Sequence, residues 1–305
     1  MPDLSCNIGS LVLQNPVMTA SGTFGYGDEL LGFLDVYRLG GIVTKSLTYK
    51  PRTGNIPPRT CETPSGMLNS IGLANIGVHR FIREKLPLYT SLGTRVIVSI
   101  AGSTFQEYCD VVKEIENADG CVDGYEINIS CPNTDKGGIA IGIKSDLSYE
   151  LIRQIRRLTK KILIAKLTPN VAGVGEIGVA VESAGADAVS LINTLIGMAI
   201  NVETRRPKIG SITGGLSGPC IKPVAIAQVY EVSRKVKIPV IGIGGIASVE
   251  DVLEFILAGA AAVQIGTFNF YAPHGTIKII EGLEKYCTAN KIDRLQDLRG
   301  KVVIK

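Results

Sequence analysis

Eight short apolar runs, rich in β-branched residues, recur along this chain, and each is followed by a segment of helical character. The chain has 305 residues, so the average spacing is about 38 residues, a normal length for a β/α unit. Runs of this kind are typical of parallel strands that are buried on both faces. The eight runs occupy residues 16–20, 41–45, 95–100, 124–129, 162–167, 187–192, 238–243 and 261–266.

The segments between these runs repeat their apolar residues at helical spacing. One such apolar face is formed by Phe105, Tyr108, Cys109, Val112 and Ile115. Another helix is predicted after Ser248, because a serine followed three residues later by Asp251 is a typical helix start. Gly259 stands where a glycine commonly ends a helix. Strands and helices are therefore expected to alternate.

Eight alternating units predict an α/β fold, a single (β/α)8 barrel over residues 1–305. We expect residues 4–13 to form an N-terminal hairpin that closes the bottom of the barrel. After the second strand, residues 47–77 contain four prolines and are expected to form a long irregular loop. Loops of that length are usually functional.

Charge and cysteine content exclude several classes of protein. The net charge is only +4 and no Lys/Arg run is present, so no nucleic-acid partner is expected. Seven cysteines without a CxxC pair argue against a disulfide framework or a thiolate metal site, and they fit a reducing compartment. With only two histidines, a histidine-rich metal site is excluded as well. No metal is expected.

The chain is also expected to have no membrane segment. Its N-terminus lacks the basic and apolar regions of a signal peptide. The longest uncharged run, residues 255–277, could span a bilayer by length, but glycines, Pro273 and polar residues interrupt it. We therefore predict that this run forms a helix end, a strand and a loop of the barrel, and that the protein is cytoplasmic.

Polar residues and glycines gather where the predicted strands end, the face at which such barrels carry their chemistry. Lys45 and Lys166 end the second and fifth strands. A single lysine there could extend to solvent, but two lysines on one rim beside glycines favour an anionic ligand. After strands seven and eight, Gly244-Gly245 and Gly266-Thr267 predict a phosphate site with the helix after Ser248, unless these glycines only turn the chain.

The densest polar cluster is Asn128-Ile129-Ser130-Cys131-Pro132-Asn133, directly after the fourth strand. Asn128 lies on the same strand face as Glu126, near the expected ligand. Cys131 follows on a loop that Gly137-Gly138 could hinge. A lone cysteine is usually structural, but a thiol near cationic groups is also a plausible base or nucleophile.

This cluster resembles the N-x-S-C-P-N loop of the class 1 dihydroorotate dehydrogenases. The resemblance extends in register from about residue 4 to the C-terminus, includes residues 44–46, 64–73, 192–194 and 214–219, and is highly specific. It is strongest for the B-type catalytic subunit, which works with a partner subunit that carries FAD and a [2Fe-2S] cluster and passes electrons to NAD. Position 99 is a departure, since Ser99 stands where the family usually has Asn.

The resemblance implies oxidation of dihydroorotate to orotate with FMN, in pyrimidine biosynthesis. Cys131 would remove the C5 proton as general base, while hydride passes from C6 to flavin N5. Lys166 would favour the negative charge of the reduced flavin. The residues implied for the substrate are Lys45, Asn69, Ser70, Ile71, Gly72, Leu73, Asn128, Asn133, Asn193 and Thr194. Those implied for FMN are Ser21, Lys45, Ser46, Ser99, Asn128, Lys166, Ile192, Gly218, Gly244, Gly245, Gly266 and Thr267.

The resemblance also implies a homodimer core with one electron-transfer subunit on each protomer, a heterotetramer. Three alternatives stay open at this point. The chain could be an A-type enzyme that uses fumarate, or a flavoprotein similar to the dihydropyrimidine dehydrogenases. It could also be a non-catalytic barrel that binds a phosphate ligand or serves in assembly.

Overall fold

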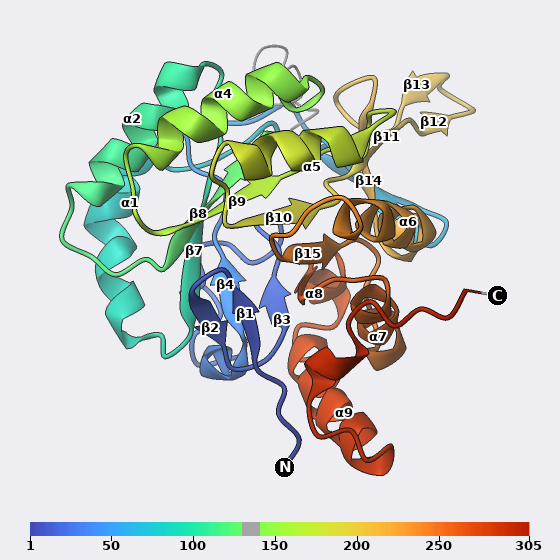
Figure 1. The fold of residues 1–305 in the computed structure, drawn as a ribbon. Helices are drawn as coiled ribbons and strands as arrows, with labels where there is room; N and C mark the ends of the chain where they lie inside the picture. Colours follow the sequence, from blue (N-terminus) through green and yellow to red (C-terminus); the bar gives the residue numbers. More distant parts are fainter. Residues whose placement is uncertain (130–140, 305) are drawn as a thin grey trace.

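The computed structural model describes residues 1–129 and 141–304. Eight parallel strands form a closed barrel in the order β10-β15-β16-β3-β4-β7-β8-β9, which is the order of the sequence around a circle. Each of the eight predicted runs contains one barrel strand, so the predicted (β/α)8 barrel is confirmed (Figure 1). The strands are β3 (Val17–Thr19), β4 (Gly41–Val43), β7 (Arg95–Ile100), β8 (Gly124–Asn128), β9 (Ile162–Lys166), β10 (Ala188–Leu191), β15 (Val240–Ile243) and β16 (Ala262–Ile265).

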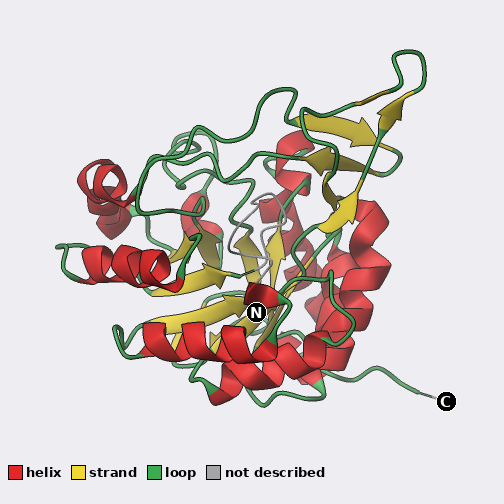
Figure 2. Cartoon of the chain, turned by 90° about the horizontal axis from the view of Figure 1, so that it is seen from above, coloured by secondary structure: helices red, strands yellow, loops and turns green. Residues whose placement is uncertain are grey.

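Helices surround the barrel on the outside (Figure 2). They are α1 (Val78–Glu84), α2 (Phe105–Glu116), α4 (Ser145–Arg156), α5 (Val174–Ser183), α6 (Lys222–Ser233), α7 (Val249–Leu257), α8 (Phe268–Tyr271) and α9 (Gly275–Ala289). Short 3-10 turns occupy Val36–Arg38, Leu86–Ser91, Pro219–Ile221 and Leu295–Leu298. The predicted start of α7 is confirmed, because Ser248 and Asp251 form a reciprocal capping box. Gly259 follows α7 with φ +115°, as a terminating glycine does.

The bottom of the barrel is closed by an N-terminal hairpin, as predicted. Strands β1 (Cys6–Ile8) and β2 (Leu11–Leu13) pair antiparallel. Cys6, Ile8 and Leu13 are buried together with apolar side chains from the lower ends of the barrel strands, such as Met18 and Ile97. The interior is therefore apolar at the amino ends of the strands, and polar chemistry is left to the opposite end.

Two expectations about loops were wrong. The segment 47–77 is not wholly irregular, because it contains a hairpin of β5 (Thr60–Thr63) and β6 (Gly66–Asn69). This hairpin joins β14 (Gly214–Ser217) and β11 (Leu195–Gly197) in a second sheet of order β11-β14-β6-β5. Its strands are only four residues long and show no apolar alternation, and β14, the partner of β6, lies far away in the sequence. In the run 255–277, the short helix α8 stands where only a loop was expected.

A separate two-stranded sheet follows β11 in the chain and lies beside the second sheet (Figure 1). Strands β12 (Ile200–Asn201) and β13 (Arg206–Pro207) pair antiparallel beyond β11 (Figure 1). Several apolar side chains are exposed in this region, among them Ile196 at 51% and Val202 at 85%.

Candidate active site

A cavity of about 230 Å³ lies at the carboxyl ends of the barrel strands. Every barrel strand except β7 contributes a lining residue at its end or just beyond it, and the second sheet contributes from β5, β6 and β14. The sequence-predicted residues that line it are Ser21, Lys45, Ser46, Asn69, Ile71, Gly72, Leu73, Asn128, Lys166, Ile192, Asn193, Thr194, Gly218, Gly244, Gly245, Gly266 and Thr267. The fold thus brings together residues that are up to 246 positions apart in the sequence.

Two predicted residues lie behind the cavity wall. Ser99 is fully buried, and its hydroxyl is hydrogen-bonded to that of Ser46, 2.8 Å away. Ser70 is also buried, and its hydroxyl accepts a hydrogen bond from the side-chain amide of Asn55 at 2.7 Å. Ser99 therefore supports a residue of the wall, whereas Ser70 is bonded to Asn55, which does not line the cavity. Cys131 and Asn133, together with Gly137 and Gly138, lie outside the described residues.

Several lining residues were not predicted from the sequence. Gly22 and Thr23 directly follow the predicted Ser21, so the strand-end argument could have included them. Phe270 and Tyr271 come from α8, a helix that the sequence did not suggest, and Met67 and Ser217 come from the second sheet. The remaining unpredicted members are Ala20, Thr60, Pro219, Ile221, Ile243, Ile246 and Phe268.

Glycines in the cavity wall fall into two kinds. Gly218 and Gly245 have φ values of +99° and +73°, which side-chain-bearing residues rarely adopt. Gly22 and Gly266 do not have such angles, and a Cβ atom at Gly22 would meet no heavy atom within 4 Å. At Gly266 the nearest atom would be 3.7 Å away, an ordinary contact. Neither backbone angle nor packing requires glycine at 22 and 266. The backbone at Gly22 faces open space, which suits a ligand that approaches it closely.

The amino end of α7 is already capped by the chain itself. The backbone N–H groups of Ala247 and Ser248 donate to the Asp251 carboxylate at 2.8 and 2.9 Å, and the Lys222 ammonium donates to it at 2.6 Å. Burial alone would raise the pKa of Asp251, but these hydrogen bonds outweigh it and lower that pKa below its usual value. The expectation that this helix end offers free amides to a phosphate is corrected for residues 247 and 248. The glycines of the predicted phosphate site, Gly244, Gly245 and Gly266, line the cavity and remain candidates for that role.

Side-chain amides form a polar array on one side of the cavity. The Asn128 amide donates to Ser46 at 3.3 Å, and the Asn193 amide donates to the Asn128 oxygen at 3.5 Å. Asn69 donates to the Gly215 carbonyl at 3.2 Å, which ties this array to the second sheet. Amides present both donors and acceptors in a fixed plane. Such an array, beside a lysine, can hold a flat ring that carries amide edges and a carboxylate.

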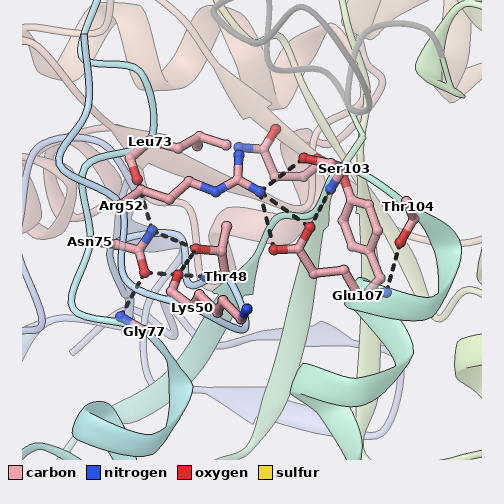
Figure 3. A network of polar contacts seen from close by, with 11 residues as sticks. Thr48, Lys50, Arg52, Leu73, Asn75, Gly77, Ser103, Thr104 and Glu107 are labelled. Atoms are coloured by element: carbon pink, nitrogen blue, oxygen red, sulfur yellow. Dashed lines mark hydrogen bonds and ion pairs between the residues drawn. The ribbon is translucent and has the colours of Figure 1, made fainter.

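The segment that carries Leu73 into the cavity is held from behind by a polar network (Figure 3). The Asn75 side chain donates to the Leu73 carbonyl at 2.7 Å and to the Thr48 hydroxyl at 2.8 Å. Arg52, which pairs with the Asn75 backbone, donates to the Glu107 carboxylate at 3.1 Å and thereby ties the segment to α2. Leu73 itself has φ +56°, so this network fixes a conformation that an isolated loop would disfavour.

Beneath the cavity lies a buried ionic cluster that the sequence did not reveal. The Glu126 carboxylate is fully buried and lies 3.4 Å from the Lys166 ammonium. It also accepts hydrogen bonds from the Ser190 hydroxyl at 2.9 Å and the Gln264 amide at 2.7 Å. Lys166 therefore has a counter-ion within the protein, in addition to any anion in the cavity.

Within 1–129 and 141–304, no group of three or more His, Cys, Asp or Glu could hold a metal ion. The two histidines lie apart, His79 near Glu114 and His274 against the ring of Phe33. No helix in the described part of the chain is both long enough and apolar enough to cross a bilayer.

A closed (β/α)8 barrel with this cavity, in which lysines, amides and open glycine positions meet at the carboxyl ends of the strands, defines a barrel enzyme with a site for an anionic ligand. The chain belongs to the dihydroorotate dehydrogenase family, whose model matches residues 3–287. The resemblance seen in the motifs is thereby confirmed. This family is flavin-dependent.

Three relatives are similar to this chain over nearly its whole length. The chain is 51% identical over 302 residues to a protein of Thermoanaerobacter sp. strain X514, covering 99% of each chain. It is 50% identical to proteins of Geotalea uraniireducens, over 99% of each chain, and Parabacteroides distasonis, over 98%. All three relatives are named the catalytic subunit of dihydroorotate dehydrogenase B (NAD+).

Proposed function

We propose that this chain is the catalytic subunit of an NAD-linked dihydroorotate dehydrogenase, which oxidises dihydroorotate to orotate in pyrimidine biosynthesis. The observation that carries the proposal is the cavity. In a chain of this family, it unites the strand-end lysines and the amide array with open glycine positions. A carboxylated ring requires the lysine and amide groups, and a phosphate-bearing cofactor requires the glycine positions beside them.

FMN is the cofactor that fits this site. The open space at Gly22 and the absence of a side chain at Gly266 support this fit, because they let a flat cofactor approach the backbone. When bound, FMN would supply the hydride acceptor, its N5 atom, for hydrogen from substrate C6. The residues proposed to hold it are Ser21, Lys45, Ser46, Asn128, Lys166, Ile192, Gly218, Gly244, Gly245, Gly266 and Thr267, with Ser99 acting through Ser46.

The substrate is proposed to lie against the amide array. Lys45 would pair with the substrate carboxylate, while Asn69, Asn128 and Asn193 would bond the amide edges of the ring. These positions select a carboxylated pyrimidine over an uncarboxylated one. The other residues proposed for this face are Ser70, Ile71, Gly72, Leu73, Asn133 and Thr194.

Cys131 is proposed as the general base that takes the C5 proton of the substrate. We expect Cys131→Ala to slow flavin reduction by dihydroorotate on the order of 10²-fold or more, because a positioned base contributes that much to a proton transfer. Single-turnover absorbance measures this rate. The matched control is Cys121→Ala, since Cys121 is an exposed free thiol away from the cavity lining. An unchanged rate in Cys131→Ala would remove this residue from the mechanism.

The decisive experiment is a flavin spectrum during anaerobic addition of dihydroorotate. Bleaching of the bound flavin supports cofactor and substrate together. A protein that takes up no FMN and binds no orotate contradicts the proposal and favours a non-catalytic barrel. Tighter binding of uracil than of orotate would instead favour a flavoprotein similar to the dihydropyrimidine dehydrogenases.

We further propose a partner subunit with FAD and a [2Fe-2S] cluster, joined to a homodimer core as a heterotetramer. The relatives' name, catalytic subunit, supports the partner. Exposed apolar side chains beside the second sheet, such as Ile196, Val202 and Ile212, support a contact between protomers. NAD reduction by this chain alone would contradict the assignment, and efficient use of fumarate would support the A-type enzyme. The free thiols of the six described cysteines support a cytoplasmic location.

A further inference from the structure

Glu126 and Lys166 stand out by burial. Among residues 1–129 and 141–304, they are the two charged side chains that are buried, with exposures of 0% and 5%. Glu126 lies on β8 and Lys166 on the adjacent strand β9 (Figure 1). The register of these strands pairs Asn128 directly with Lys166. Lys166 lines the cavity and Glu126 does not. The carboxylate therefore lies behind the ammonium, on the side away from the ligand.

Three strands fix the position of this carboxylate. Besides the Lys166 ammonium at 3.4 Å, it accepts from Ser190 on β10 and from Gln264 on β16. A carboxylate accepts hydrogen bonds, and each of these three partner groups can donate one. Lys166 in turn lies 3.4 Å from the hydroxyl of Ser21, which faces the cavity. The ammonium is thus held between the carboxylate and the ligand site.

A buried ion pair of this kind is a poor way to stabilise a fold. Removing two charges from water costs free energy that their attraction often fails to recover, and apolar substitutes of similar volume are commonly as stable. The interior directly below is filled with apolar side chains such as Ile164 and Ile241. The polar cluster therefore points to a role at the cavity above it.

We propose that Glu126 is a positioning residue which, through Lys166, sets the reduction potential of the flavin. This inference rests on the proposed function, which places FMN in the cavity. Interactions between charges are strong and weakly screened in a buried site. The Glu126 charge partly cancels that of Lys166, so negative charge on the reduced flavin is stabilised less and the potential stays low. A low potential favours the onward passage of electrons to NAD, a weak oxidant.

The test is the midpoint potential of the FMN-loaded protein, measured against reference dyes. Glu126→Gln removes the charge and keeps the volume, so we expect the potential to rise by about 30 mV, a tenfold change in a two-electron equilibrium. The matched control is Gln264→Met, which removes a hydrogen bond to the same carboxylate without changing charge. We expect no rise for this control. An unchanged or lower potential in Glu126→Gln, or an equal rise in both variants, overturns the inference.

A second variant keeps the test decisive if Glu126→Gln does not fold. Glu126→Asp retains the charge but withdraws it from Lys166 by one methylene, so a smaller rise is expected, and a potential at or below that of the unaltered protein overturns the inference. The unaltered protein separates this inference from the proposed function. If it takes up no flavin, or is not bleached by dihydroorotate, the proposed function fails. If it passes both tests and the variants do not raise the potential, only the role of Glu126 fails.

Discussion

At the scale of single residues, the cavity glycines are of two kinds that mutation can separate. Gly245 is needed by the backbone, with φ +73° and a Cβ position only 2.7 Å from that of Lys222. Gly22 is bordered by open space. The first glycine serves the fold, and the second leaves room for whatever the cavity holds.

Alanine is therefore expected to affect stability at position 245 and ligand binding at position 22. Gly245→Ala should lower the free energy of unfolding by about 1–3 kcal/mol, because it forces a side chain into a left-handed conformation. Gly22→Ala should change the free energy of unfolding by less than about 0.5 kcal/mol, as unstrained substitutions do. The added methyl group should nevertheless weaken FMN binding about tenfold, because it occupies the open space at Gly22. Urea unfolding of the apoprotein and fluorescence titration with FMN measure the two quantities. Unaltered FMN affinity in Gly22→Ala would contradict the proposal that FMN lies against the backbone at Gly22.

Which residues could be found from the sequence depended on their place along a strand. Lys45, Asn128 and Lys166 were predictable because a strand end marks the functional face of a barrel. Glu126 was noted only as a neighbour of Asn128, and Ser190 and Gln264 were missed. Each is a single polar residue within an apolar run, and only closure of the barrel brings the three strands to one point. Such convergence leaves no local signal.

At the scale of elements, the hairpin of β1 and β2 carries a buried thiol that serves as a probe of the closed barrel. Burial raises the pKa of Cys6 from 9.0 to about 12, with the neighbouring charges of Arg299 and Asp3 as smaller influences. In the unfolded chain this thiol ionises near its ordinary pKa. The folded protein therefore holds one proton more than the unfolded chain between these two pH values.

This difference predicts a loss of stability in alkali. The contribution of Cys6 is fully present below pH 9 and is lost as the pH rises from 9.0 toward 12. Over that window the free energy of unfolding should fall by up to about 1.4 kcal/mol per pH unit on account of this thiol. Urea unfolding at a series of pH values should show a shallower decline for Cys6→Ala than for the unaltered protein. Parallel declines would show that the hairpin does not exclude water from Cys6.

Elements differed in how far they could be predicted. The eight barrel strands are buried on both faces, and their apolar composition marks them at once. The β5–β6 hairpin is half-exposed, and its inner strand β6 is stabilised by pairing with β14, whose residues lie 146 to 150 positions later in the sequence. A strand that owes its existence to so distant a partner has no periodicity of its own to detect.

At the scale of the whole molecule, the cavity wall is drawn from residues 20 to 271, almost the full length of the chain. A ligand held there contacts segments that come together only when the barrel is closed. Binding is therefore linked to global unfolding rather than to the opening of one loop.

FMN is expected to raise the melting temperature of the apoprotein by several degrees. At about 100 times its dissociation constant, a ligand that binds only the folded state adds about 2.7 kcal/mol of stability. Scanning calorimetry measures the shift, with riboflavin at equal concentration as the control that lacks the phosphate. The rise should be smaller with riboflavin, because it lacks the phosphate that is proposed to contact Gly244, Gly245 and Gly266. Equal shifts would contradict the phosphate site at these glycines.

The second sheet has a consequence for how such a barrel can be altered. Its strands come from two loops, one after β4 and one after β10, and they are joined by the register Gly215 to Asn69, Leu216 to Leu68 and Ser217 to Met67. Both loops also contribute side chains to the cavity. A graft that exchanges one loop with that of a homologue would leave the other without its pairing partner. The two loops therefore form one structural unit, and a graft should exchange both of them together.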